Sequence, residues 1–188
     1  MRVGKTSEYA YTILGDVKEC EIIYKNLVEV NSKVDYPVTP CGFDCLELAV
    51  LEVRSPNFSY ETEKFGNIFE LGLQWHINYG KEEYIGCKKI KEICDNEIEK
   101  CSVGFLYDGE PIGVNSSIFL KDGNEVGYVM YSMFSIKLNK TIGIAMLNNP
   151  FFQANLDLNI KNCDNEIREI KTVSAPFVRP LSWDLKMN

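Results

Sequence analysis

The chain has 188 residues, 45% of them apolar and 25% charged, and a formal net charge of −7, which fits a globular protein of one large or two small domains. The negative charge and the absence of a basic block argue against a nucleic-acid-binding protein. No apolar run approaches the roughly 20 residues that span a bilayer, and no apolar signal core follows the N-terminal basic residues, so we expect a cytoplasmic protein without a membrane partner.

The N-terminal third is predicted to contain one strand and two helices. Residues Tyr9–Leu14 are rich in β-forming side chains and precede a Gly-Asp pair, which predicts a strand. Asp16 followed by Glu19 has the pattern of a capping box, and the apolar spacing of Val17–Val30 predicts a helix that lies on a sheet. A second helix is predicted over Cys41–Val53. It ends near a Ser-Pro pair, because residues before proline avoid helical angles.

The segment from Tyr60 to Ile90 is interpreted as a junction between two units. It is predicted to contain a strand, Trp75–Tyr79, then a turn and a helix, Glu82–Asn96. Turn signals recur at short intervals beyond the junction and separate six predicted strands: Ser102–Leu106, Ser117–Leu120, Glu125–Phe134, Ile142–Met146, Gln153–Ile160 and Glu166–Val173. The predicted fold class is therefore α+β, with a partial mixed α/β unit over residues 1–97 and a small antiparallel β-barrel over residues 98–188.

The seven cysteines are interpreted as reduced structural thiols, because their number is odd and no signal peptide precedes them. Cys41 and Cys45 stand one helical turn apart, but a zinc site needs two further ligands at a suitable spacing. The single histidine, His76, falls in a predicted strand. We therefore predict no metal site.

Four blocks of sequence lie in a fixed order between residue 2 and about residue 178. They are Arg2-x-Gly4-x-Thr6-x-Glu8-x-x-Tyr11; Glu70-x-Gly72-Leu-x-Trp75 with Lys81-x-x-Tyr84-Ile85-Gly86; Gly127-x-Val129 with Phe134-Ser135-x-x-Leu138 and Ile142-Gly143-x-Ala145; and Pro176-Phe177-Val178. In order and spacing these blocks resemble the glycine-cleavage T-proteins, which are folate-dependent aminomethyltransferases. The resemblance implies a partial folate-binding-type domain followed by the C-terminal T-protein barrel.

The same resemblance implies a tetrahydrofolate site. In the family a glutamate binds the pterin ring, because a carboxylate offers two coplanar acceptors to the adjacent N–H donors of the ring. Glu8 stands at that position, and the alternative for it is a surface glutamate on an edge strand. Trp183 falls near where relatives place an aromatic residue close to folate, and the alternative is a tail residue packed on the barrel. Tyr11 and Trp75 are interpreted as core aromatic residues.

The chain departs from the family pattern around this site. Ser7 and Ala10 replace glycines on either side of the glutamate, and they add atoms where the backbone approaches the ring. Leu46 and Val50 stand where the family carries arginines, one of which is thought to reach the folate tail, and neither can donate to a carboxylate. We therefore expect an eroded or altered folate site. No catalytic residue is predicted, because the catalytic aspartate of the family lies in the half that this chain lacks.

Family members run to roughly twice this length, so the resemblance implies a truncated relative. The function expected is that of a tetrahydrofolate-dependent aminomethyl- or methyltransferase that needs an N-terminal half, from a second chain or in a homodimer. One alternative is a non-catalytic scaffold or assembly subunit that keeps the T-protein half-fold. Another is a fragment or decayed product without activity. The sequence does not predict the one-carbon donor or the partner.

Overall fold

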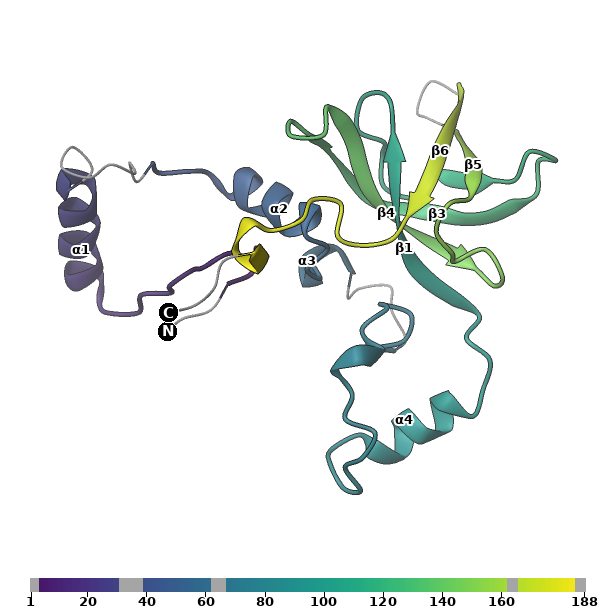
Figure 1. Ribbon diagram of the computed structural model, residues 1–188, viewed down its shortest axis with the longest axis horizontal. Helices are drawn as coiled ribbons and strands as arrows, with labels where there is room; N and C mark the ends of the chain where they lie inside the picture. The colour runs from purple at the N-terminus through teal and green to yellow at the C-terminus, as the bar shows by residue number, and fades with distance from the viewer. Residues whose placement is uncertain (1–3, 31–38, 62–66, 162–165, 185–188) are drawn as a thin grey trace.

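The structure is a computed structural model that describes residues 4–30, 39–61, 67–161 and 166–184. Figure 1 shows a β-barrel at one end of the molecule and helix α1 at the other, with the rest of the helical segments between or beside them. The α-helices in the described ranges are α1 (Val17–Val30), α2 (Phe43–Glu52), α3 (Phe58–Glu61) and α4 (Cys87–Cys94), and short 3₁₀ helices span Gln74–His76 and Leu181–Asp184. None of the helices in these ranges is long and apolar enough to cross a membrane.

Six antiparallel strands close into a barrel in the order β1-β4-β3-β2-β5-β6. The strands are β1 (Lys100–Tyr107), β2 (Ser117–Phe119), β3 (Glu125–Ser135), β4 (Lys140–Asn148), β5 (Asp157–Lys161) and β6 (Ile167–Val173). Closure removes exposed sheet edges, because β1 pairs with β4 on one side and with β6 on the other. The predicted small antiparallel barrel is thus confirmed.

Strand β4 is buried on both faces and divides the core into two clusters. Ala145 and Leu147 pack with Phe105 in one cluster, whereas Ile144 and its even-numbered neighbours pack with Leu51 of α2 in the other. Successive side chains of a strand point to opposite faces, so α2 covers the face of β4 opposite to the Phe105 cluster. This contact fixes α2 and the chain that follows it against the barrel.

Two glycines of the barrel motif allow a close approach between neighbouring groups. A Cβ atom on Gly143 would lie 2.4 Å from the Phe105 ring, and one on Gly127 would lie 2.0 Å from the backbone oxygen of Met146. Such distances are far below van der Waals contact, so any larger residue would force the strands or the ring to move. The glycines of this motif therefore have a packing role in the barrel.

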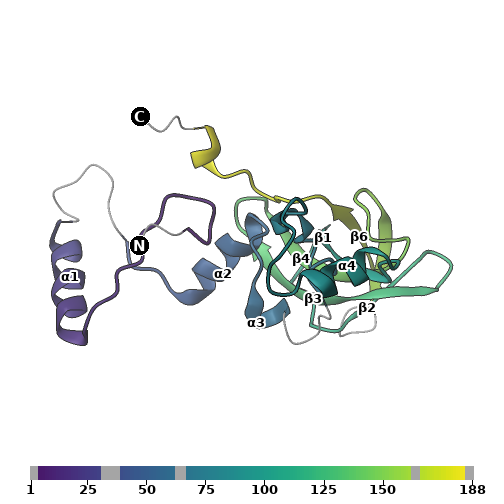
Figure 2. The same cartoon turned by 90° about the horizontal axis from the view of Figure 1, so that it is seen from below.

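Helix α1 has the predicted bounds but not the predicted packing. Its capping box is present, since the backbone N–H of Glu19 donates to the Asp16 carboxylate at 2.9 Å and Asp16 N–H donates back to Glu19 at 3.4 Å. No residue of α1 is buried, and both Figure 1 and Figure 2 show the helix well away from the barrel. The prediction that it lies on a sheet was wrong, because the described chain offers no sheet beside it.

Two predicted strands are absent from the described residues. Residues Tyr9–Leu14 contain only an isolated bridge at Tyr11, and Trp75–Tyr79 begins instead with the end of a 3₁₀ helix. A strand is stable only where a neighbouring strand pairs along its backbone, and within the described residues neither segment has such pairing beyond the single bridge at Tyr11. Accordingly Tyr11 is 76% and Trp75 is 70% exposed, so the interpretation of both as core residues was also wrong.

The other helix predictions hold in part. Helix α2 matches the predicted helix within two residues at each end, whereas α4 begins at Cys87, five residues later than predicted, directly after Gly86 in a left-handed conformation with φ of 90°. The described cysteines, which do not include Cys163, are all free thiols. Cys87 is buried and Cys94 is exposed, so only the first acts as a core residue. The described residues contain no group of three ligands that could hold a metal ion.

Candidate functional site

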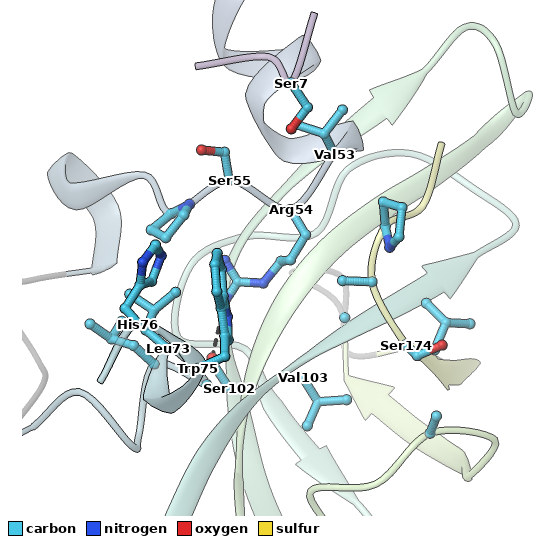
Figure 3. Close-up of a pocket in the computed structure, with 18 of the residues that line it drawn as sticks. Ser7, Val53, Arg54, Ser55, Leu73, Trp75, His76, Ser102, Val103 and Ser174 are labelled. Atoms are coloured by element: carbon cyan, nitrogen blue, oxygen red, sulfur yellow. Dashed lines mark hydrogen bonds between the residues drawn. The ribbon is translucent and has the colours of Figure 1, made fainter. Parts of the chain in front are cut away.

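A cavity of about 650 Å³ lies beside the barrel, between strands β1 and β6, the chain after α2 and the 3₁₀ helix Gln74–His76. Figure 3 shows side chains from all of these elements around it. Its volume is in the range of small-molecule sites, which is roughly 300–1,000 Å³. The residues that line it are mostly apolar or hydroxyl-bearing, and they include Ser7, Arg54, Trp75, His76, Ser102, Ser174 and Trp183.

The end of helix α2 forms one wall of the cavity. The N–H of Ser55 donates to the carbonyl of Val50 at 3.0 Å and that of Arg54 to Leu51 at 2.9 Å, which is a helix C-terminal turn of the Schellman type. Arg54 itself adopts a left-handed conformation with φ of 56°, a position usually held by glycine. The turn directs the chain from α2 into the Ser-Pro segment and places the Arg54 side chain at the cavity wall.

Arg54 is held in this position by a buried carboxylate. Its guanidinium group donates to both oxygens of Glu61 at 3.0 and 3.1 Å and also to the Ser102 hydroxyl at 2.9 Å. The Glu61 side chain is fully buried and accepts two more hydrogen bonds, from the backbone N–H of Asn57 and the hydroxyl of Tyr131, each at 2.9 Å. A bidentate, fully hydrogen-bonded pair is the arrangement in which a buried ion pair is best tolerated. These residues join the chain after α2, helix α3, β1 and β3.

The barrel side of this cluster is aromatic. Tyr131 stacks on Tyr60 with ring centroids 5.2 Å apart and an interplanar angle of 20°. Burial, and then the charge of Glu61, raises the pKa of Tyr131 far above its usual range, so its phenol stays protonated and keeps donating to the carboxylate. Of this cluster, Arg54 and Ser102 line the cavity, whereas Tyr60 and Tyr131 line a separate hollow on the other side of the pair.

The cavity is also lined by exposed aromatic rings. The Trp75 indole and the His76 imidazole stack with centroids 3.6 Å apart, and both residues line the cavity. Trp183, at the start of the C-terminal tail, also lines the cavity and is 56% exposed. These rings offer flat apolar surface to a ligand, whereas the serine hydroxyls and backbone around them offer hydrogen bonds.

Glu8 lies beside the cavity, but its carboxylate already has partners. One oxygen accepts the backbone N–H of Leu181 at 2.6 Å and the other accepts that of Ser182 at 3.0 Å. The Ser182 hydroxyl and then these two N–H groups favour the ionised form of Glu8 and lower its pKa below the ordinary value. The same hydroxyl lies 2.7 Å from the carbonyl oxygen of Ser7, to which it donates. The carboxylate is thus ionised at neutral pH and binds two adjacent N–H donors from the chain itself.

The structure brings the two predicted site residues to the same region, since Glu8 binds the residues just before Trp183. Leu46 and Val50, which the resemblance sets at the positions of family arginines, instead line a second, apolar cavity of about 820 Å³ along α2. The sequence did not indicate Arg54 or Glu61 as site residues. The pattern Arg-Ser-Pro after a helix marks a chain reversal, but nothing local predicts that its arginine meets a buried glutamate.

The described lining of the cavity contains two basic groups, Arg54 and His76, and no carboxylate. Arg54 is already paired with Glu61. A nucleophile activated by an adjacent base, or a pair of carboxylates for acid–base work, is not present among the described lining residues. The arrangement therefore supports recognition of a flat polar molecule and gives no basis for a catalytic residue.

Comparison with known proteins relates the barrel to a known family of domains. Residues 100–179 match the family described as "Glycine cleavage T-protein C-terminal barrel domain". The crystal structure of glycine cleavage system aminomethyltransferase T from Bartonella henselae superposes with a TM-score of 0.70 at 16% identity, over 85% of this chain and 44% of that chain. This likeness confirms a T-protein-like fold, with helices followed by a six-stranded barrel.

Curated relatives agree with this assignment at low identity. The aminomethyltransferase of Thermotoga neapolitana is 26% identical over 147 residues, which cover 78% of this chain and 39% of the relative, and that of Thermosipho melanesiensis is 25% identical over 180 residues, covering 95% and 47%. The heme-dependent oxidative N-demethylase gamma subunit of Ectopseudomonas mendocina is 24% identical over 169 residues, covering 85% of this chain. The chain spans about half the length of the aminomethyltransferases that it matches, or less.

Proposed function

Because residues 100–179 match the model of glycine cleavage T-protein C-terminal barrel domains, and the chain is distantly similar to aminomethyltransferases, we propose that it is the barrel-bearing half of a tetrahydrofolate-dependent one-carbon transferase. The transfer is of an aminomethyl or methyl group. A second chain, or a second copy of this chain, supplies the remaining half of the site. On this proposal the chain contributes ligand binding, and the catalytic residues come from the other half.

The observation that carries the proposal is the coincidence of three features at one cavity. The cavity has the volume of a small-molecule site, exposed indole rings line it, and an ionised carboxylate that binds two adjacent N–H donors lies beside it. A pterin ring presents adjacent N–H donors and a flat aromatic face. Glu8 has the acceptor geometry for the donors, and Trp75 and Trp183 offer surfaces on which the ring can stack.

The fit to tetrahydrofolate is partial. The folate tail carries carboxylates, and the arginine of the cavity wall is already neutralised by Glu61. Leu46 and Val50 are apolar and lie on the second cavity. The described residues therefore match the pterin end of the ligand better than its anionic end. We assign recognition of the tail to the second half of the assembly.

Isothermal titration of the chain with tetrahydrofolate tests this proposal. We expect binding that the Glu8→Ala variant weakens at least about tenfold, which corresponds to about 1.4 kcal/mol, because the variant loses both acceptors of the pterin donors. The matched control is Glu19→Ala, which removes a carboxylate of the α1 capping box, far from the cavity, and leaves the affinity unchanged. The absence of binding by the wild-type chain, alone and in the assembled complex, would refute the proposal.

A second candidate function is that of a non-catalytic subunit. The specific observation in its favour is helix α1, whose apolar residues Val17, Tyr24, Leu27 and Val28 share one face and are 43–84% exposed. An apolar face left exposed by the described part of the chain favours an interaction with another protein. One relative is the gamma subunit of a multi-subunit enzyme by its name. Size-exclusion chromatography with light scattering distinguishes the cases, since a well-folded, strictly monomeric chain would argue against a need for any partner.

A further inference from the structure

The two ends of the described chain are tied together beside the cavity. Glu8 accepts the backbone N–H groups of Leu181 and Ser182, and the Ser182 hydroxyl donates to the carbonyl of Ser7. Leu181 lies 173 residues after Glu8 in the sequence, so the contact has no local cause. Ser7 adopts a left-handed conformation with φ of 56°, which is uncommon for a residue with a side chain and is held here by the contact.

This contact forms part of the enclosure of the cavity. Ser7 directly precedes Glu8 and Trp183 directly follows Ser182, and both Ser7 and Trp183 line the cavity. Figure 2 shows the C-terminal 3₁₀ helix on the same side of the molecule as the N-terminal segment and apart from the barrel strands. The segment Leu181–Asp184 packs no buried residue against the rest of the protein. The chain enters it from the buried Pro180, and Asp184 pairs with Arg179, so the hydrogen bonds that tie the segment to the described N-terminal residues are the three to Ser7 and Glu8.

We propose that the contact of Glu8 with Leu181 and Ser182 is a self-inhibitory latch, and that a ligand with two adjacent N–H donors, such as a 2-aminopyrimidinone ring, must displace these residues to bind Glu8. The ligand class rests on the proposed function, whereas the latch rests on the geometry of this chain. The two backbone N–H groups present the same pair of adjacent donors that the ligand would present. Leu181 and Ser182 each occupy one oxygen of Glu8, and a carboxylate offers only one such side-by-side pair of positions to a two-donor ligand. Closure of the latch and two-donor binding of the ligand therefore exclude each other.

The expected change in ligand affinity follows from the fraction of molecules in which the latch is open. When only a fraction of molecules has a competent site, the apparent dissociation constant rises by the inverse of that fraction. A latch that is closed in about nine molecules out of ten weakens ligand binding about tenfold. Opening the latch without removing Glu8 should therefore tighten binding by about this factor.

A pair of full-length variants separates the latch from other roles of the C-terminal turn. Leu181→Pro/Ser182→Pro removes both N–H donors and keeps Glu8 and Trp183, and proline is tolerated in the first turn of a helix. Leu181→Ala/Ser182→Ala removes the same side chains but keeps both N–H donors, so it is the matched control. We expect the proline variant to bind tetrahydrofolate, and pterin without a tail, about tenfold more tightly than the alanine variant. Equal or weaker binding by the proline variant would overturn the proposal.

A ligand-free measurement keeps the latch testable even if folate does not bind. With Trp75 replaced by phenylalanine, Trp183 is the only tryptophan, and its quenching by acrylamide reports how firmly the turn is attached. We expect the proline variant and Glu8→Ala to be quenched more strongly than the alanine control. Identical quenching in all three would overturn the latch. Increased quenching without any ligand binding would refute the proposed folate function and leave the latch in place.

Discussion

Replacement of Glu61 by glutamine tests how much the buried cluster contributes to the fold. Glu61 is fully buried and accepts four hydrogen bonds: two from Arg54, one from the Asn57 backbone and one from Tyr131. Glutamine keeps the shape of the side chain but turns an NH₂ group toward these donors and leaves the guanidinium group, which is 11% exposed, without its counter-charge. Loss of one member of a buried ion pair costs about 3–5 kcal/mol, and we expect about 3 kcal/mol because solvent still reaches the arginine.

Urea and thermal unfolding followed by circular dichroism measure this cost. For a chain of this length about 1 kcal/mol lowers the melting temperature by about 2–4 °C, so we expect a decrease of about 6–12 °C. The control is Glu21→Gln, which breaks the exposed ion pair with Lys25 and should change the free energy of unfolding by less than about 0.5 kcal/mol. Equal stabilities of the two variants would show that the cluster does not hold the α2–α3 segment on the barrel.

Two further predictions concern the barrel and the chain ends. Gly143→Ala should destabilise the protein by about 1–3 kcal/mol, because the new Cβ meets the Phe105 ring at 2.4 Å, whereas Gly42→Ala, with no atom within 4 Å, should be close to neutral in the same urea titration. The pKa of Glu8 in the folded state is lower than the ordinary glutamate pKa of 4.5. The hydrogen bonds of its carboxylate therefore stabilise the folded state fully at pH values above 4.5, and this stabilisation is lost as the pH falls through the folded-state pKa. The fluorescence of Trp183, with the other tryptophan replaced by phenylalanine, should therefore change in acid, and a Glu8→Gln variant that shows the same transition would contradict this assignment.

Local sequence patterns were sufficient for the barrel and for helix α1. Turn residues such as Asp122-Gly123 and Asn149-Pro150 interrupt short apolar runs, and each of the six strands predicted for the barrel overlaps an observed one. The capping box of Asp16 and Glu19 depends on residues three positions apart, so it too was visible in the sequence. The same local reasoning failed for Tyr9–Leu14, because strand propensity has no effect without a neighbouring strand.

The candidate site depends on contacts that no local pattern reports. Tyr131 lies 70 residues after Glu61, and Leu181 lies 173 residues after Glu8. The resemblance to T-proteins placed Glu8 and Trp183 in one site, and the structure brings them together. It did not indicate that the carboxylate already accepts hydrogen bonds from the chain. That finding required the backbone positions of Leu181 and Ser182, because N–H donors are present in almost every residue and leave no mark on the sequence.

The pairing of β1 with β6, which closes the barrel, affects how the chain folds during its synthesis. Gly104 of β1 pairs with Val173 of β6, so a growing chain leaves that side of β1 unpaired until almost the whole barrel has left the ribosome. An open strand edge can recruit a strand from a neighbouring chain. Substitutions that weaken β6 should therefore reduce the yield of soluble protein at high expression more than their effect on the finished molecule would indicate.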